Sequence, residues 1–198
     1  MSLDTSKSSL NGRAAKATRT DYEYPLGELI FAAGDIGQAW RIRHGAVRLD
    51  RLLGSERIFA GLALEGDILG ADTLLYGVYS FDARALSDVT LEPWLQHNQA
   101  PTGESLLKTL AATERRAAEA LSLRGGEALD RVRQLMLLLA HGRQQIVIPG
   151  LKDMAEITGL TIETVSRAMS RLSKSGLLKR QGRRLGLIFA EQASPLAV

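Results

Sequence analysis

The sequence contains no cysteine. This excludes disulfides, thiolate-bound zinc, cysteine-held iron–sulfur clusters and cysteine nucleophiles. Long apolar runs are also missing, because no segment approaches the roughly 18 to 20 residues that a membrane span needs. Residues 1–20 are polar and lack the apolar core of a signal peptide. We therefore expect a cytoplasmic protein that makes no contact with a membrane.

The apolar content is sufficient for a folded protein. Of the 198 residues, 45% are apolar and 24% are charged, which is the balance of a globular chain with one large or two small domains. The charges are unevenly distributed: residues 1–127 contain 14 Lys+Arg and 17 Asp+Glu, whereas residues 128–198 contain 11 and 5. A basic C-terminal third is typical of a part that contacts a polyanion such as nucleic acid.

Composition divides the chain into four zones, residues 1–20, 21–97, 98–124 and 125–198. The first zone predicts a flexible arm. In the second, glycines recur at spacings of 3 to 9 residues between short apolar stretches with a partial period of two, such as Arg57–Leu62. This pattern predicts a small antiparallel β-roll made of strands, without helices.

The third zone has the pattern of one amphipathic helix of about 20 residues. Apolar and small residues recur there at spacings of three and four: Leu106, Leu110, Thr113, Ala117 and Ala120 or Leu121. This seam could pack on its own domain or pair with the same helix of a second chain. Because Thr113, Ala117 and Ala120 are small and permit close approach, we favour a dimerisation helix.

The segment from Ile146 to Phe189 has the pattern of a winged helix. A short helix over Leu151–Ile157 and a second over Thr161–Ser175 are joined by a turn in which Gly159 supplies left-handed geometry, as in a helix-turn-helix. Residues 177–189 predict two strands around a basic turn, which would be the wing. The opening threonine of the second helix can cap it.

The second helix has two different faces. Val165, Met169 and Leu172 form an apolar face that should be buried. The opposite face is polar and repeats at helical spacing: Glu163, Ser166, Arg167, Ser170, Arg171 and Lys174. This division predicts a helix with one side in the core and the other free to bind.

The polar face carries side chains suited to DNA bases. Arg167 presents a planar fork that can bond to a guanine edge, Glu163 can accept a hydrogen bond from the cytosine amino group, and Ser166 can touch thymine. We expect these three to contact bases. Further residues are candidates for phosphate contacts, which position the protein without selecting sequence: Thr161, Thr164, Arg171, Lys174, Arg183 and Arg184.

Residues 151–167 closely resemble the DNA-binding signature of the CRP/FNR family of bacterial transcription regulators. Gly34-Asp35, Gly45-Ala46-Val47 and residues 66–70 resemble the glycine landmarks of the family's N-terminal β-roll, and Leu106–Leu123 lies where its long dimerisation helix belongs. The resemblance implies an α+β fold: an antiparallel, cyclic-nucleotide-binding-like β-roll, a long dimerisation helix and a C-terminal winged helix-turn-helix. It also implies a homodimer whose partners are double-stranded DNA and RNA polymerase.

The resemblance also indicates which DNA would be bound. The Glu163-x-x-Ser166-Arg167 pattern is similar to the FNR-type pattern that recognises half-sites like TTGAT. The CRP type has an arginine immediately before the glutamate, where this chain has Ile162. An inverted repeat of TTGA-like half-sites about one helical turn apart is therefore implied. Whether the protein activates or represses transcription is left open.

The effector is unknown from the sequence. In the family, the cyclic-nucleotide site has a Gly-Glu pair and, later in the chain, Arg-Ser. Here Ala71-Asp72 follows Gly70, and the later segment is Val78-Tyr79-Ser80-Phe81. We therefore do not expect cyclic nucleotide binding, although Arg84 leaves a rearranged anion site as an alternative. The iron–sulfur sensor of FNR is excluded by the absence of cysteine.

Two other functions fit the sequence less well. Haem could be held by His97, with Trp40, Tyr76, Phe81 and Trp94 as pocket walls, but lone histidines and aromatics are explained more simply as surface and core residues. A cupin-like enzyme would need histidines converging on a metal. The three histidines, His44, His97 and His141, are scattered in the sequence, and no nucleophile–base pair stands out. We therefore expect neither an enzyme nor a metal site.

Overall fold

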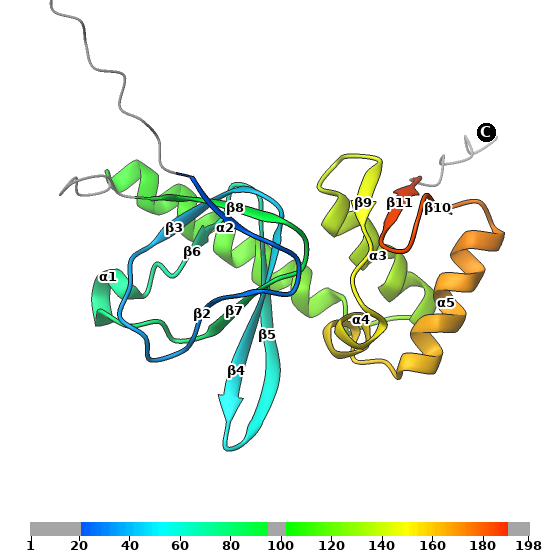
Figure 1. The fold of residues 1–198 in the computed structure, drawn as a ribbon, viewed down its shortest axis with the longest axis horizontal. Coiled ribbons are helices and arrows are strands. Elements are labelled where there is room, and N and C mark those ends of the chain that lie inside the picture. Colours follow the sequence, from blue (N-terminus) through cyan, green and yellow to red (C-terminus); the bar gives the residue numbers. More distant parts are fainter. Residues whose placement is uncertain (1–20, 95–101, 190–198) are drawn as a thin grey trace, which may run out of the picture.

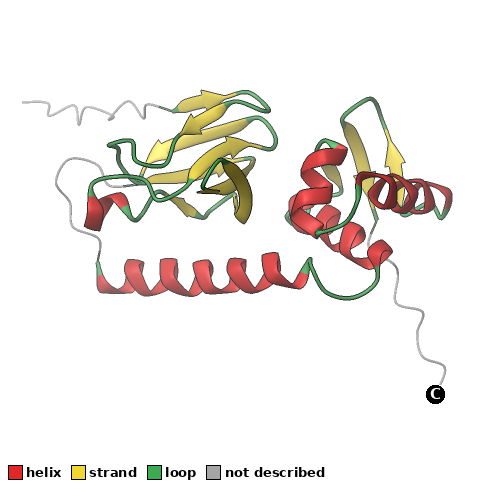
Figure 2. Ribbon diagram, turned by 90° about the horizontal axis from the view of Figure 1, so that it is seen from below, coloured by secondary structure: helices red, strands yellow, loops and turns green. Residues whose placement is uncertain are grey.

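The computed structural model describes residues 21–94 and 102–189, which form two lobes (Figure 1). The first lobe is a β-roll with the long helix α2 (Gly103–Ser122) lying alongside it (Figure 2), and the second is a smaller bundle of helices and short strands. The predicted flexible arm, residues 1–20, lies outside the described residues.

Two antiparallel sheets form the roll. The strands of one, in spatial order, are β1 (Tyr22–Tyr24), β8 (Val89–Pro93), β3 (Trp40–His44) and β6 (Ile68–Leu69). Those of the other are β2 (Leu29–Phe31), β7 (Asp82–Ala85), β4 (Ala46–Leu53) and β5 (Glu56–Leu64). Alternate residues such as Val47, Ala63 and Leu91 point into a shared apolar core, as the period of two predicts.

One element of the roll was not predicted. Helix α1 (Thr73–Tyr76) forms a single turn and ends at Gly77, which has a φ of 75°. The expectation of strands without helices is wrong here, because the six residues between Gly70 and Gly77 leave room for one turn. The turn is held by the Thr73 hydroxyl, which donates to the Gly70 carbonyl over 2.7 Å.

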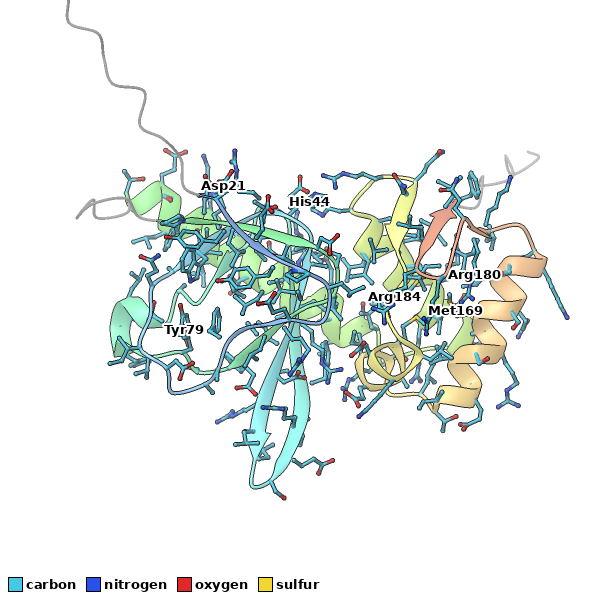
Figure 3. The ribbon with its side chains drawn as sticks, viewed as in Figure 1. Asp21, His44, Tyr79, Met169, Arg180 and Arg184 are labelled. Atoms are coloured by element: carbon cyan, nitrogen blue, oxygen red, sulfur yellow. The ribbon has the colours of Figure 1, made fainter. Side chains whose placement is uncertain are left out.

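The aromatic ring of Tyr79 fills one end of the roll (Figure 3). The ring stacks on Phe31 with centroids 3.5 Å apart. Its hydroxyl accepts a hydrogen bond from Trp40 Nε1 over 3.0 Å and donates one to the Gln38 carbonyl over 2.9 Å. A Cβ added at Gly37 would lie 2.2 Å from the Tyr79 hydroxyl, so the backbone can approach the ring only without a side chain.

Replacing Tyr79 by alanine is expected to destabilise the protein by about 3–5 kcal/mol, the usual cost of deleting a buried aromatic side chain. The midpoint of urea unfolding, followed by tryptophan fluorescence, would measure the loss. Tyr76→Ala is the matched control, because this neighbouring tyrosine on α1 is 71% exposed and its removal should change stability by less than about 0.5 kcal/mol. Equal midpoint shifts in the two variants would contradict the packing described above.

Helix α2 packs against β5 with one face. Arg116, Ala120 and Leu123 are buried on this face, and Arg116 Nε donates to Asp67 Oδ2 over 2.8 Å. The helix begins after the Thr102 cap, whose hydroxyl accepts from the Ser105 amide. Another face of the helix carries exposed leucines: Leu106, Leu107, Leu110 and Leu121.

The second lobe is a three-helix unit covered by a small sheet. Helix α3 (Ala128–Ala140) is followed by β9 (Gln145–Val147), the paired helices α4 (Leu151–Thr158) and α5 (Ile162–Lys174), and the strands β10 (Leu178–Arg180) and β11 (Leu185–Ile188). The three strands pair antiparallel in the order β10-β11-β9. All three helices bury apolar residues in one core.

Candidate nucleic-acid interface

Helices α4 and α5 form the predicted helix-turn-helix. Gly159 ends α4 with a φ of 65°, the left-handed conformation that the turn requires. The Leu160 amide then donates to the Ala155 carbonyl over 3.0 Å. The Thr161 hydroxyl caps α5 by accepting from the Thr164 amide over 3.2 Å. The predicted helices therefore agree with the structure to within one residue at each end.

The two faces of α5 are divided as predicted. Val165, Met169 and Leu172 are buried, and Ala168 joins them. Glu163, Ser166 and Arg167 are exposed together on the opposite side, within the first two helical turns after the Thr161 cap. The buried face fixes the rotation of the helix about its axis, so that these three polar side chains point away from the protein.

Glu163 and Arg167 are both placed to exchange their present contacts for contacts with DNA bases. The pKa of the Glu163 carboxyl is lowered, chiefly by a hydrogen bond from its own backbone amide and by a second from the Thr161 hydroxyl, so it stays ionised as an acceptor. Arg167 Nη2 donates to the Thr164 hydroxyl over 3.3 Å. A hydrogen bond of this length is weak and easily exchanged for a base edge.

The predicted phosphate-contacting residues lie around α5 in two grooves and at the wing. One groove is lined by Ser166, Ser170 and Lys174, together with Arg180 at the end of β10. The other lies between α5 and the start of α3 and is lined by Thr164, Arg167 and Arg171. Arg183 and Arg184 are exposed in the wing turn between β10 and β11 (Figure 3).

Arg180 was missed by the sequence analysis. It lies in the wing strand β10, in which Leu178 is buried while Lys179 and Arg180 are exposed. The run of Lys179 and Arg180 beside the basic turn was the available signal. Because Arg180 borders the same groove as Lys174, it extends the basic surface from α5 onto the wing.

The histidines are less scattered than the sequence suggested. His44 and His141 line one small pocket between the lobes, where Arg143 Nη2 donates to Glu65 Oε2 over 2.6 Å and His44 lies 3.5 Å from the same carboxylate (Figure 3). Burial raises the pKa of Glu65, but the Arg143 hydrogen bond and the charges of Arg143 and the two histidines together lower it by more, so its net shift is downward. His97 lies outside the described residues.

Two of the aromatic residues considered as walls of a haem pocket lie in other surroundings. Tyr76 is largely exposed, and Trp40 packs edge-on against Tyr22 with ring centroids 4.9 Å apart. Among residues 21–94 and 102–189, no group of three or more histidine, aspartate or glutamate side chains is placed to hold a metal ion. Nor does this part of the chain contain a helix long and apolar enough to cross a membrane.

A β-roll, a long helix and a winged helix with an open polar face define a DNA-binding transcription regulator. Two family models match the chain accordingly: the cyclic nucleotide-binding domain over residues 22–92 and the Crp-like helix-turn-helix domain over residues 130–191.

The similarity extends over most of the chain. The nitrogen fixation regulation protein FixK of Rhizobium meliloti is 30% identical over 162 residues, which cover 78% of this chain and 76% of that protein. The cyclic AMP receptor protein of Thermus thermophilus is 32% identical over 169 residues, covering 79% and 78%. The solved structure of FixK2 from Bradyrhizobium japonicum has a TM-score of 0.68 and 25% identity, covering 87% of this chain and 93% of that one.

The chain belongs to the CRP/FNR family of transcription regulators. This confirms the predicted family and the α+β fold, with a β-roll followed by a helix-turn-helix domain. It also confirms that the protein is a DNA-binding regulator of transcription and not an enzyme.

Proposed function

We propose that two copies of this chain bind an inverted repeat of TTGA-like half-sites. The α5 helix of each copy enters the major groove of one half-site. The observation that carries the proposal is the joint exposure of Glu163, Ser166 and Arg167 on one face of α5, opposite a fully buried face. A helix held in this way can enter the groove with all three side chains directed at base edges.

Each side chain has its own part in this proposal. The Arg167 guanidinium bonds bidentately to a guanine, the ionised Glu163 accepts from a cytosine amino group, and Ser166 lets the backbone approach a thymine methyl group. The surrounding residues contact phosphates: Thr161, Thr164, Arg171, Lys174, Arg183 and Arg184, to which Arg180 is added.

Helix α2 supports the dimer. Leu106 and Leu110 are 46% and 57% exposed, on a face that also holds Thr113 and Ala117. Such a stripe on a long helix is suited to pairing with its twin about a two-fold axis. Ala120 is only 7% exposed and faces this chain's own roll, whereas Leu121 is 73% exposed. The last position of the seam was expected to be Ala120 or Leu121. In the proposed interface it is Leu121.

The interior of the roll argues against a cyclic nucleotide as the signal. Tyr79 stands where the family's site would have an arginine, and its buried ring occupies the space itself. Arg84, the alternative anion ligand, donates to the Gly27 carbonyl over 2.9 Å on the exposed side of β7. The effector stays unassigned, and contact with RNA polymerase stays a prediction.

Titrating the full chain onto fluorescent duplexes tests the proposal. A palindrome of TTGA-like half-sites should bind about 1,000-fold or more tightly than a scrambled duplex of the same length and composition. Light scattering of the complex should give two chains per duplex. Equal affinity for both duplexes, or one chain per palindrome, would show the proposal to be wrong.

A further inference from the structure

A cluster of charged side chains joins the β-roll to the first helix of the helix-turn-helix. At its centre is Arg48 of β4, a charged residue that is only 4% exposed. Arg48 Nε donates to Asp50 Oδ1, on the same strand, over 2.7 Å. The two terminal nitrogens cross to α4, where Nη1 donates to Asp153 Oδ1 over 3.1 Å and Nη2 pairs with the Glu156 carboxylate.

The geometry of this cluster restricts how α4 is oriented relative to β4. Asp153 and Glu156 are three positions apart on α4 and therefore face the same side of the helix. A guanidinium is a rigid planar fork, so satisfying carboxylates on both sides restricts the angle between β4 and α4. Burial alone would lower the pKa of Arg48, but the hydrogen bonds to Asp50 and Glu156 raise it overall, and the charge persists.

Neighbouring contacts join the end of α2 to α4 and to the β4–β5 hairpin. Arg124, just after α2, donates from Nη2 to the Glu156 carbonyl over 2.9 Å. Its guanidinium also lies 5.5 Å from the ring centre of Phe59 on β5, and Arg48 lies 5.9 Å from the same ring. The ends of α2 and α4 therefore meet the β4–β5 hairpin at one place, which we call the Arg48 cluster: Arg48, Asp50, Asp153 and Glu156.

We propose that the Arg48 cluster positions the helix-turn-helix for DNA binding, with Arg48 as a positioning residue that does not itself touch DNA. This inference rests on the proposed dimer and its inverted repeat. If paired α2 helices fix the two rolls relative to each other, the angle between each roll and its α4 sets the distance and direction between the two α5 helices. The Arg48 cluster would thereby select the spacing of the half-sites.

The test is the dependence of DNA affinity on half-site spacing. Arg48→Met keeps the length of the side chain and removes its charge and hydrogen bonds. The wild-type chain should bind a palindrome of one spacing more tightly than palindromes that are one base pair longer or shorter. The ratio of affinities should be about five-fold or more, a typical coupling between sites. In Arg48→Met this preference should fall below about two-fold, while the preference for a TTGA-like over a scrambled half-site is kept.

Arg57→Met is the matched control. Arg57 pairs with Asp82 over 2.8 Å within the roll, so the same substitution removes an arginine ion pair that does not reach α4. Its spacing preference should equal that of the wild type. Glu156→Gln is a milder second variant, since it leaves Arg48 paired with Asp50 and Asp153, and it should reduce the spacing preference in part. If circular dichroism shows Arg48→Met to be unfolded, Glu156→Gln decides the question.

The outcomes separate this inference from the proposed function. An unchanged spacing preference in Arg48→Met, or in Glu156→Gln where it decides, would overturn the inference. An equal loss of affinity at every spacing would do the same, because it would show a role in stability alone. If instead the wild-type chain itself fails to distinguish any TTGA-like palindrome from scrambled DNA, the proposed function is wrong, whatever the variants do.

Discussion

Arg167→Ala is expected to remove most of the sequence preference of the protein. One bidentate contact to guanine contributes about 1–3 kcal/mol of discrimination, and a palindrome has two such contacts. Because Arg167 is exposed and its hydrogen bond to the Thr164 hydroxyl is long, its removal should leave the fold intact. Fluorescence anisotropy with TTGA-like and scrambled duplexes would measure the change in the ratio of the two affinities.

Lys174→Ala is the matched control on the same helix. Lys174 is a proposed phosphate contact, so its loss should weaken binding to both duplexes alike. The slope of log affinity against log salt concentration should also fall by about 1 for each phosphate contact removed. An Arg167→Ala variant that keeps the full wild-type ratio would mean that Arg167 does not contact a base.

Leu110→Glu is expected to produce a monomer. The side chain is 57% exposed at the middle of the apolar face of α2, and a two-fold axis would bring two such carboxylates together at the interface. Loss of a central interface residue costs about 2 kcal/mol or more, equivalent to roughly 30-fold weaker association or beyond. Analytical ultracentrifugation would measure the assembly state, and the anisotropy assay the accompanying loss of palindrome binding.

Arg115→Gln provides the comparison for this variant. Arg115 is exposed on the same helix, but away from the leucines, and its contact with Glu119 is a distant 3.9 Å. Removing its charge should change neither the assembly state nor DNA binding. A Leu110→Glu chain that sediments as the same dimer as the Arg115→Gln chain would show that α2 does not form the interface through this face.

The helix-turn-helix could be predicted because its determinants are local. The cap at Thr161, the left-handed Gly159 and the spacing of Val165, Met169 and Leu172 all lie within a few residues of the structure they specify. Helical periodicity also fixes which side chains lie opposite the buried ones. The candidate base contacts therefore followed from the sequence without knowledge of the rest of the chain.

The orientation of α2 was harder to predict because both of its faces carry apolar or small residues. The roll-facing side includes Arg116, which is buried because it pairs with Asp67 in the turn before β6. A buried arginine looks like a solvent-exposed residue in a hydropathy pattern. Ala120 was therefore grouped with Leu106 and Leu110, although it is buried against the roll and they are exposed.

The Arg48 cluster could not be predicted for a related reason. Val47 points into the roll, so alternation places Arg48 on the outside, where an arginine is expected to meet water. Its partner Asp153 lies 105 residues further along the chain. Periodicity reports which side of a strand is apolar, but not that a second lobe covers the other side.

The exposed leucines of α2 have a consequence for gene control in the cell. If only paired chains grip an operator, then at low abundance the concentration of active species rises with the square of the amount synthesised. Promoter output would respond steeply to expression level even without a small-molecule signal. A copy with a defective α5 but an intact α2 would pair with normal copies, so such an allele would behave as dominant.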